Sequence, residues 1–206
     1  RDDQGCEAFR LLAVTLAADP DHAQARQAGG WVRRVDEGTT TWLWPEAARR
    51  QSRREAFSPE FGWLLKTWQP RYAEGLRRQG TRWVAKEKLP APQTVADAPL
   101  WQSDHWRISQ LADEADVAQL AARLEEAYTV WWQAFGSFAM ERGELQRRFE
   151  GQHRASPAAA MQAVHFASRQ QYVDTLERLE PQIGRTLGIY WMPTQTSYFF
   201  EADDVG

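Results

Sequence analysis

Four histidines and one cysteine are the residues of this sequence best suited to bind a transition metal. A catalytic zinc site on a helix needs two histidines four residues apart, so that both imidazoles project from one face. A glutamate between them takes a proton from the zinc-bound water. The histidines here are His22, His105, His153 and His165; no two are four residues apart, and none is followed by Glu. We therefore expect no metal site and no catalytic residue within this chain.

The remaining patterns give no stronger indication of catalysis. His105 and His165 fall in expected strands and could meet in space, but two histidines without a third ligand would bind a metal weakly. Structural or surface roles are therefore favoured for all four histidines. Glu125 and Glu126 are neighbours on an expected helix and point to different sides, which argues against paired-carboxylate catalysis. The sequence contains no glycine-rich phosphate loop, no G-x-S-x-G elbow and no metal-spaced cysteine set.

The composition is that of an ordinary globular protein. Of the 206 residues, 43% are hydrophobic and 26% are charged, and the net charge is −3. This charge gives no electrostatic reason to expect nucleic acid or an anionic membrane as a partner. A peptide or protein partner is possible. Cys6 is the single cysteine, so an internal disulfide is excluded. No apolar run approaches the roughly 18 residues of a membrane-spanning helix. Oligomeric state and compartment are left open.

The patterning predicts an α+β chain of three successive segments that begins with a helical hairpin over residues 1–28. Its first helix should stop before Asp19-Pro20, and its second should end at Gly29-Gly30. The run LLAVTLAADPDHAQAR resembles the junction between tetratricopeptide repeats, so the hairpin is either the remnant of such an array or a private helical pair. The chain begins with Arg1 and stops directly after a strand-like run. We expect it to be a piece of a longer protein.

Residues 29–97 contain a degenerate repeat of glycine and tryptophan and end in a proline-containing linker. Gly30-Trp31-Val32 is followed by Gly38 and Trp42-Leu43, and Gly62-Trp63-Leu64 is followed by Gly80 and Trp83-Val84. Aromatic and aliphatic pairs separated by a glycine turn are typical of short β-hairpins. We expect one hairpin from each half, the second being longer because of a helical insertion around Tyr72, Leu76 and Arg77.

The pattern of residues 98–206 predicts an incomplete mixed α/β domain. A helical stripe runs from Val117 through Trp131 and Phe135 to Phe138, which indicates one long amphipathic helix. Ser168 with Gln171 forms a capping-box pattern and opens a helix expected to end at Pro181. Shorter elements complete the domain: strands at 105–108 and 161–166, a helix at 144–150 before a loop at 151–157, and a C-terminal hairpin of 188–191 with 197–200.

These segments together resemble an uncharacterised family that pairs tetratricopeptide-like repeats with a thermolysin-type, gluzincin-like zinc metallopeptidase domain. The stretches that carry the resemblance are SDHWRI, LEEAYTVWWQAFGSF, VHFASRQQYVDTL and LGIYWMPTQTSYFF. The resemblance implies that this chain is the non-catalytic front portion of a hydrolase. Zinc would then be bound only in the intact parent, by a His-Glu-x-x-His helix that follows Gly206.

The same resemblance assigns a scaffold role to the C-terminal hairpin. In such enzymes an edge strand pairs with the extended substrate backbone. Gly188, Ile189, Tyr190 and Trp191 are the candidate substrate edge, since a glycine leaves room for close backbone approach.

Two alternatives involve no catalysis. The eleven tryptophans could present indole faces to carbohydrate or to a peptide, which would make the chain a binding module. Exposed indoles in a row would favour that function, whereas buried indoles would favour the scaffold. A structural interaction domain attached to a repeat array is the third hypothesis.

Overall fold

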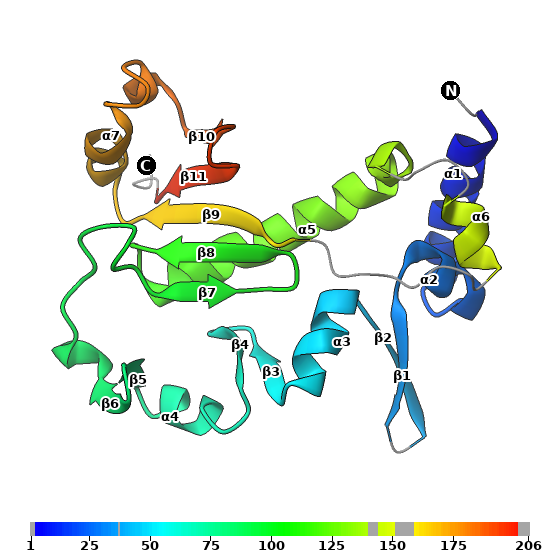
Figure 1. Ribbon diagram of the computed structural model, residues 1–206, viewed down its shortest axis with the longest axis horizontal. Helices are drawn as coiled ribbons and strands as arrows, with labels where there is room; N and C mark the ends of the chain where they lie inside the picture. Colours follow the sequence, from blue (N-terminus) through cyan, green and yellow to red (C-terminus); the bar gives the residue numbers. More distant parts are fainter. Residues whose placement is uncertain (1–2, 37, 140–143, 151–158, 202–206) are drawn as a thin grey trace. The chain divides into compact units, whose positions relative to one another are not determined.

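The computed structural model of the chain describes residues 3–36, 38–139, 144–150 and 159–201. They form the expected α+β fold, with N-terminal helices, small antiparallel hairpins, a long helix and a five-stranded mixed sheet (Figure 1). The chain divides into two units, each made from two separated stretches. Residues 1–53 with 126–158 form the helical unit, and residues 54–125 with 159–206 form the sheet unit. The segments 1–28, 29–97 and 98–206 are consecutive stretches of sequence and remain a prediction.

Helices that bury aromatic side chains make up most of the helical unit. Phe9 of the first helix meets Trp132 with ring centroids 4.8 Å apart, and Leu12, Ala28 and Leu145 are buried with them. The elements are α1 (Asp3–Ala18), α2 (Ala23–Gly29), β1 (Val32–Asp36), β2 (Thr39–Leu43), α3 (Pro45–Ser52), the second half of α5 (Glu114–Ala139) and α6 (Glu144–Phe149).

Local signals set both ends of α2, of which the end at Gly29-Gly30 was expected. His22 accepts a hydrogen bond from Ala25 N through Nδ1 at 3.2 Å, so this histidine serves as the N-cap. Gly30 takes a left-handed conformation with φ of 98°, which ends the helix. The next residue, Trp31, lies with its ring centroid 4.2 Å from that of Trp44, and both rings meet Trp132 edge-on. The indoles here are core material rather than a surface row.

The sheet unit contains the five-stranded sheet, in the order β10-β11-β9-β8-β7. The central pairs β8–β9 and β9–β11 are parallel, whereas the outer pairs β7–β8 and β10–β11 are antiparallel. The elements of the sheet are β7 (Leu100–Gln102), β8 (Trp106–Gln110), β9 (Met161–Phe166), β10 (Gly188–Trp191) and β11 (Thr196–Phe200). The helical elements beside them are the first half of α5, α7 (Arg169–Leu176) and the 3-10 turn η2 (Ile183–Arg185).

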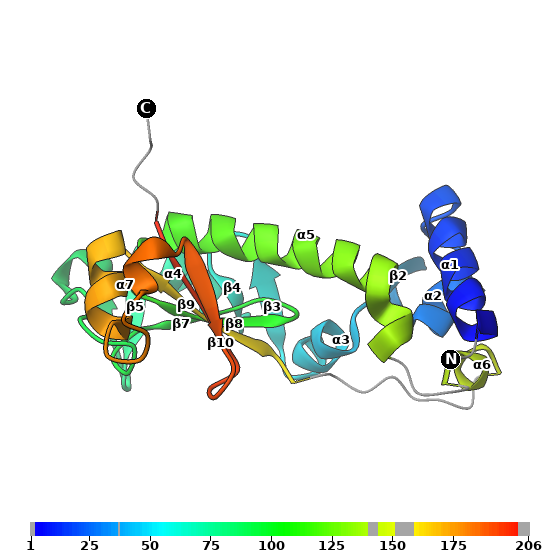
Figure 2. The ribbon, with the colours of Figure 1, turned by 90° about the horizontal axis from the view of Figure 1, so that it is seen from above.

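Each face of this sheet packs against a different helix. Figure 2 shows the first half of α5 along one face, where Val117 and Ala121 bury themselves against Ile108 and Ala163. The other face is covered by α7. Its Tyr172 and Leu176 pack with three buried residues of the sheet: Val164, Phe166 and Tyr198. Because alternate residues of a strand point to opposite faces, both faces of β9 are buried. This explains why MQAVHF alternates only weakly in polarity.

The two-unit division also changes which face of α5 is buried. The expected stripe holds at Val117, but Trp131 and Phe135 are exposed by 45% and 51%. The second half of the helix belongs to the helical unit and buries Trp132 instead, with 7% exposed. The prediction of one uniformly buried stripe was therefore wrong, because the two halves pack against different partners.

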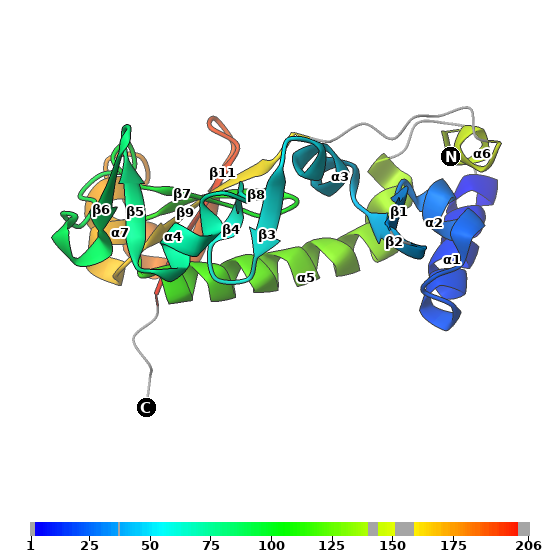
Figure 3. The same ribbon diagram turned by 90° about the horizontal axis from the view of Figure 1, so that it is seen from below.

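Three small hairpins, rather than two, form in the glycine–tryptophan segment. The first repeat is β1–β2, as expected. The second repeat does not form one long hairpin; its two tryptophan strands pair with different partners. The expected helical insertion includes Tyr72 but not Leu76 and Arg77, which lie in a strand. Figure 3 brings these hairpins to the front: β3 (Glu55–Ser58) with β4 (Gly62–Leu65), and β5 (Leu76–Gln79) with β6 (Arg82–Ala85), joined by α4 (Gln69–Ala73) and followed by η1 (Lys86–Lys88). Pairing with the nearest extended segment closes a shorter loop and costs less chain entropy.

The remaining predicted elements form with shifted boundaries; the strand expected at 105–108, for example, runs over Trp106–Gln110. Ser168 Oγ accepts from Gln171 N at 3.2 Å, and Gln171 Oε1 accepts from Ala167 N at 3.1 Å, close to the expected capping box. The helix itself ends at Leu176, before Pro181 is reached. The loop expected at 151–157 lies outside the described residues.

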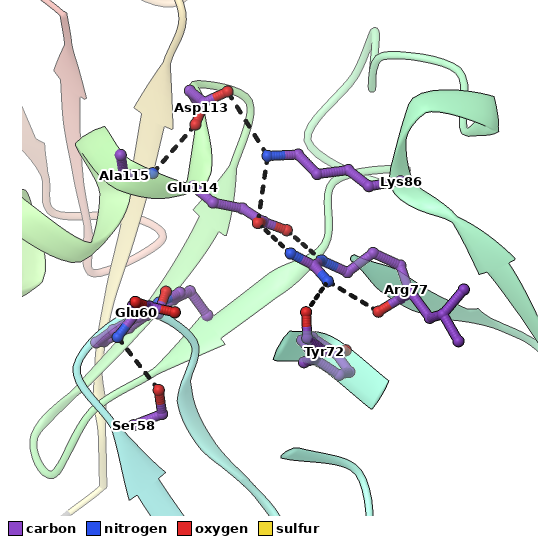
Figure 4. A network of polar contacts seen from close by, with 10 residues as sticks. Ser58, Glu60, Tyr72, Arg77, Lys86, Asp113, Glu114 and Ala115 are labelled. Carbon is purple, nitrogen blue, oxygen red and sulfur yellow. Dashed lines mark hydrogen bonds and ion pairs between the residues drawn. The ribbon is translucent and has the colours of Figure 1, made fainter. Parts of the chain in front are cut away.

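A salt bridge attaches the β5–β6 hairpin to the start of α5 (Figure 4). The Arg77 guanidinium donates to both carboxylate oxygens of Glu114 and, through Nη1, to Tyr72 O at 3.0 Å and Leu76 O at 2.8 Å. Lys86 Nζ lies 3.3 Å from Glu114. Burial raises the pKa of the Glu114 carboxyl, but the hydrogen bonds and positive charges of Arg77 and Lys86 together outweigh burial and hold that pKa below its usual value.

We predict that Glu114→Gln lowers the free energy of unfolding by about 2 kcal/mol, because Arg77 would lose its charge partner in a partly buried site. Urea unfolding of the full chain measures this. Glu126→Gln, on an exposed position of the same helix, is the matched control and should change the free energy by less than about 0.5 kcal/mol. Equal effects of the two substitutions would contradict an anchoring role for the pair.

Candidate functional site at the open edge of the sheet

One edge of the five-stranded sheet is closed by the neighbouring β3–β4 hairpin. Gly62 of β4 lies so close to β7 that a Cβ there would be 2.3 Å from Gln102 O. Its φ of 70° also favours glycine. Two indoles fasten this contact: Trp101 Nε1 donates to Glu60 O at 3.3 Å, and Trp63 Nε1 donates to Asp104 Oδ1 at 2.7 Å. The β7 edge is therefore covered by the chain itself.

The opposite edge is the strand β10, which comprises the four residues predicted as a substrate edge. Gly188, Ile189, Tyr190 and Trp191 all pair with β11 on one side. On the other side, no strand pairs with β10 within the part of the chain that the structure describes. Figure 1 shows β10 at the top of the stacked strands, at the far end of the sheet from β7.

The hydrogen-bonding pattern of β11 identifies which backbone groups of β10 point outward. Glu201 N donates to Phe166 O on β9. Because successive residues of a strand bond to opposite sides, Phe199 and Ser197 also face β9, and Tyr198 and Thr196 face β10.

The register then settles the arrangement within β10. Tyr198 lies opposite Ile189 and Thr196 lies opposite Trp191, so these two residues of β10 bond to β11. Gly188 and Tyr190 therefore direct their N–H and C=O groups away from the sheet. The open edge presents two donors and two acceptors in the spacing of an extended strand.

Side chains hold β10 in place on one face and leave apolar groups at its rim. Ile189 and Trp191 pack against the core beneath α7. Tyr190 projects on the opposite face and is 53% exposed, and the residues that flank the strand, Leu187 and Met192, are 81% and 70% exposed. An anchored strand with exposed apolar neighbours is suited to receive another extended chain.

Gly188 makes room for the neighbouring strand, whereas the sequence suggested that it makes room for a substrate. A Cβ at Gly188 would meet Tyr198 O at 3.1 Å and Phe199 Cδ1 at 3.3 Å, both on the partner strand β11. The glycine therefore makes room for packing within the sheet, and it does not by itself indicate close approach of a substrate.

We predict a two-residue alternation in amide hydrogen exchange along β10. The amides of Gly188 and Tyr190 should exchange about tenfold or more faster than those of Ile189 and Trp191, whose N–H groups bond to β11. Residue-resolved exchange by NMR checks this. Uniform protection of all four amides would mean that something covers the outer side of the strand.

The two histidines described in the sheet unit, His105 and His165, do not converge. His22 caps α2, and His153 lies outside the described residues. His105 O accepts from Met161 N at the start of β9, whereas His165 pairs with Gln110 towards the other end of that strand. His105 and His165, which could have met in space, are therefore separated by most of the length of β9. Among the described residues no three His, Cys, Asp or Glu side chains gather as a metal site would require.

Glu125 forms a polar cluster that sequence reasoning missed. Its carboxylate accepts from Ser103 Oγ at 2.5 Å and from His105 N at 2.8 Å, and its Oε2 lies 2.6 Å from His105 Nδ1. Burial raises the pKa of Glu125, but hydrogen bonds from His105 and Ser103 outweigh burial and keep the pKa below its usual value. The cluster ties the β7–β8 turn to α5. The spacing of the sequence could have indicated this cluster. Glu125 follows Val117 and Ala121 at intervals of four residues, so it lies on the same face of the helix as these two apolar residues.

His165 is a buried histidine of the sheet with one ring nitrogen unpartnered among the described residues. It is 2% exposed; Nε2 lies 3.4 Å from Glu201 Oε2, and Nδ1 has no hydrogen-bond partner among the described residues. Burial lowers the pKa of His165, with a smaller opposite effect from Asp116. A histidine whose pKa is lower in the folded chain takes up its proton more readily when unfolded, so acid favours unfolding.

We predict that the free energy of unfolding falls as the pH drops below about 6.5, the usual pKa of an unfolded histidine. His165→Met should reduce this dependence between pH 7.5 and 5.5, because methionine keeps the site apolar and does not titrate. Urea unfolding at several pH values measures the slope, which for one group cannot exceed about 1.4 kcal/mol per pH unit. An unchanged slope in His165→Met would show that other groups cause it.

The tryptophans do not form an exposed row. Trp131 is the single exposed indole among the eleven, and Trp63, Trp101 and Trp132 are buried. In several indoles an arginine guanidinium stacks on one face of the ring and covers it. Within the described part of the chain, no helix combines the length and apolarity needed to cross a membrane.

No protein-family model, curated protein or solved structure matches this chain.

Proposed function

We propose that this chain is a peptide-binding scaffold, the non-catalytic front portion of a zinc metallopeptidase-like protein, which takes an extended polypeptide along the outer side of β10. The observation that carries the proposal is the outward direction of the Gly188 and Tyr190 backbone groups at an edge where no other described strand pairs. Sheet edges of this kind bind peptides by adding a strand, with backbone hydrogen bonds supplying affinity.

Backbone chemistry supports an extended peptide as the ligand. Outward N–H and C=O groups on alternate residues match the spacing of another β-strand and do not match a helix or a sugar. Each backbone hydrogen bond contributes about 0.5–1.5 kcal/mol net. Four such bonds, from Gly188 and Tyr190, would support moderate affinity, to which side-chain contacts add.

Exposed apolar side chains support a preference for apolar residues in the peptide. Tyr190 projects beside the edge, and Leu187 and Met192 stand at its two ends. Covering them with apolar side chains would gain about 25 cal/mol for each Å² removed from water. The expected ligand therefore carries apolar residues at alternate positions.

The described residues do not fit a zinc site, because His105 and His165 lie at different ends of β9 and no three donor side chains gather among the described residues. We therefore derive no catalytic step in this chain. In the proposed arrangement, the metal and its general base belong to residues of the parent protein outside it, and the scaffold fixes the substrate backbone.

The proposal predicts that Tyr190→Pro weakens peptide binding by about tenfold, because proline removes one outward donor and its ring obstructs the edge. The bonds to β11 are kept, so folding should be little changed. The probes are fluorescent decapeptides of alternating valine and threonine, measured by anisotropy. Tyr190→Thr, which keeps the N–H group, is the matched control and should lose about threefold or less.

Hydrogen exchange on the bound complex provides the second measurement. Peptide binding should slow exchange at the Gly188 and Tyr190 amides and leave the Ile189 and Trp191 amides as they were. Failure of every probe peptide to bind, or protection at other strands only, would refute the proposal. Concentration-dependent dimerisation through the same amides would assign the edge to a second copy of the chain instead.

A further inference from the structure

A second surface of the sheet unit carries a charge opposite to that of the whole chain. Residues 66–88, which include α4 and the β5–β6 hairpin, contain seven Lys and Arg residues and two acidic residues, Glu74 and Glu87, for a net charge of +5. Since the whole chain has a net charge of −3, the remaining residues have a net charge of −8. This segment is therefore a local basic surface on an acidic protein.

Only part of this positive charge is used inside the protein. Arg77 and Lys86 pair with Glu114, as Figure 4 shows. Arg71, Arg78 and Arg82 are exposed. None of these three has an ion-pair partner among the described residues.

Tryptophans hold two of the exposed arginines in position. The Arg71 guanidinium lies over the Trp83 ring at 5.0 Å from its centroid, and the Arg78 guanidinium lies over Trp68 at 4.5 Å. The two indoles pack against each other at right angles, with centroids 5.8 Å apart. Stacking restrains side chains that would otherwise lose entropy on binding, and the planar guanidinium keeps its N–H donors at its rim.

We propose that this surface binds an acidic peptide segment of a partner protein, with carboxylates accepting hydrogen bonds from Arg71 and Arg78. The arginine fork matches a carboxylate in two parallel hydrogen bonds. Nucleic acid fits less well for two reasons. Guanidiniums already lie over the indole faces that bases would stack on, and a long polyanion would extend over the acidic remainder of the chain. The proposal is independent of the β10 edge.

The test uses the full chain and a fluorescein-labelled deca-glutamate peptide at low ionic strength. R71Q/R78Q should raise the Kd for this peptide at least tenfold, whereas R178Q/R185Q, which removes two exposed arginines from another part of the sheet unit, should leave it within about twofold. Equal losses in the two variants would show attraction by net charge alone and would overturn the proposal, as would absence of binding by the unaltered chain.

Two further measurements keep the test decisive. Near-ultraviolet circular dichroism reports whether R71Q/R78Q retains its packed tryptophans; if it does not, R82Q replaces it. Arg82 has no ring partner among the described residues, and its substitution should weaken binding about threefold. A ten-nucleotide thymidine oligomer should bind at least tenfold more weakly than the peptide at the same salt concentration. Tighter binding of the oligomer would assign the surface to nucleic acid.

Discussion

Backbone N–H and C=O groups need hydrogen-bond partners, and this requirement shapes the sheet unit. In each of the two edge strands of an open sheet, half of these groups point outward and have no partner within the sheet. This protein closes one edge with its own chain. Gly62 allows β4 to approach β7 so closely that no side chain would fit between them. At β10 no other described strand takes that place. The two edges are therefore chemically different, and the candidate function follows from that difference rather than from any catalytic group.

Helix α5 positions the rest of the sheet unit through two partly buried carboxylates. Glu114 binds Arg77 of the β5–β6 hairpin, and Glu125 binds the turn that contains Ser103 and His105. Eleven residues correspond to about three helical turns, so both carboxylates lie on one side of the helix. Burying a carboxylate is costly unless hydrogen bonds replace its water, and both groups have such bonds. They make the docking of helix and hairpins specific at positions where apolar contacts alone would allow sliding.

The tryptophans serve two structural purposes and not the one that composition alone suggests. In the helical unit, Trp31, Trp44 and Trp132 pack with one another and with aliphatic side chains in the core. In the hairpins they fasten small strands through indole N–H groups, as Trp63 does at Asp104, or restrain arginines, as Trp68 and Trp83 do. An isolated two-stranded hairpin has marginal stability. This explains why these short strands carry so many large aromatic side chains.

Taken alone, the sequence determined the elements whose signals are local: the end of α2 at Gly30, the capping box at Ser168, the long helix, and the strand at 188–191. Tertiary structure alone decided that the strands of Gly62 and Trp83 pair with different partners and that Trp132 rather than Trp131 is buried. It also decided that the Glu125 carboxylate accepts hydrogen bonds from a turn, and that Gly188 makes room for Phe199. The reason is physical. Caps and turns are set by residues within a few positions of one another, whereas strand partners and buried faces depend on contacts between segments far apart in the chain, whose pairing short-range patterns do not encode.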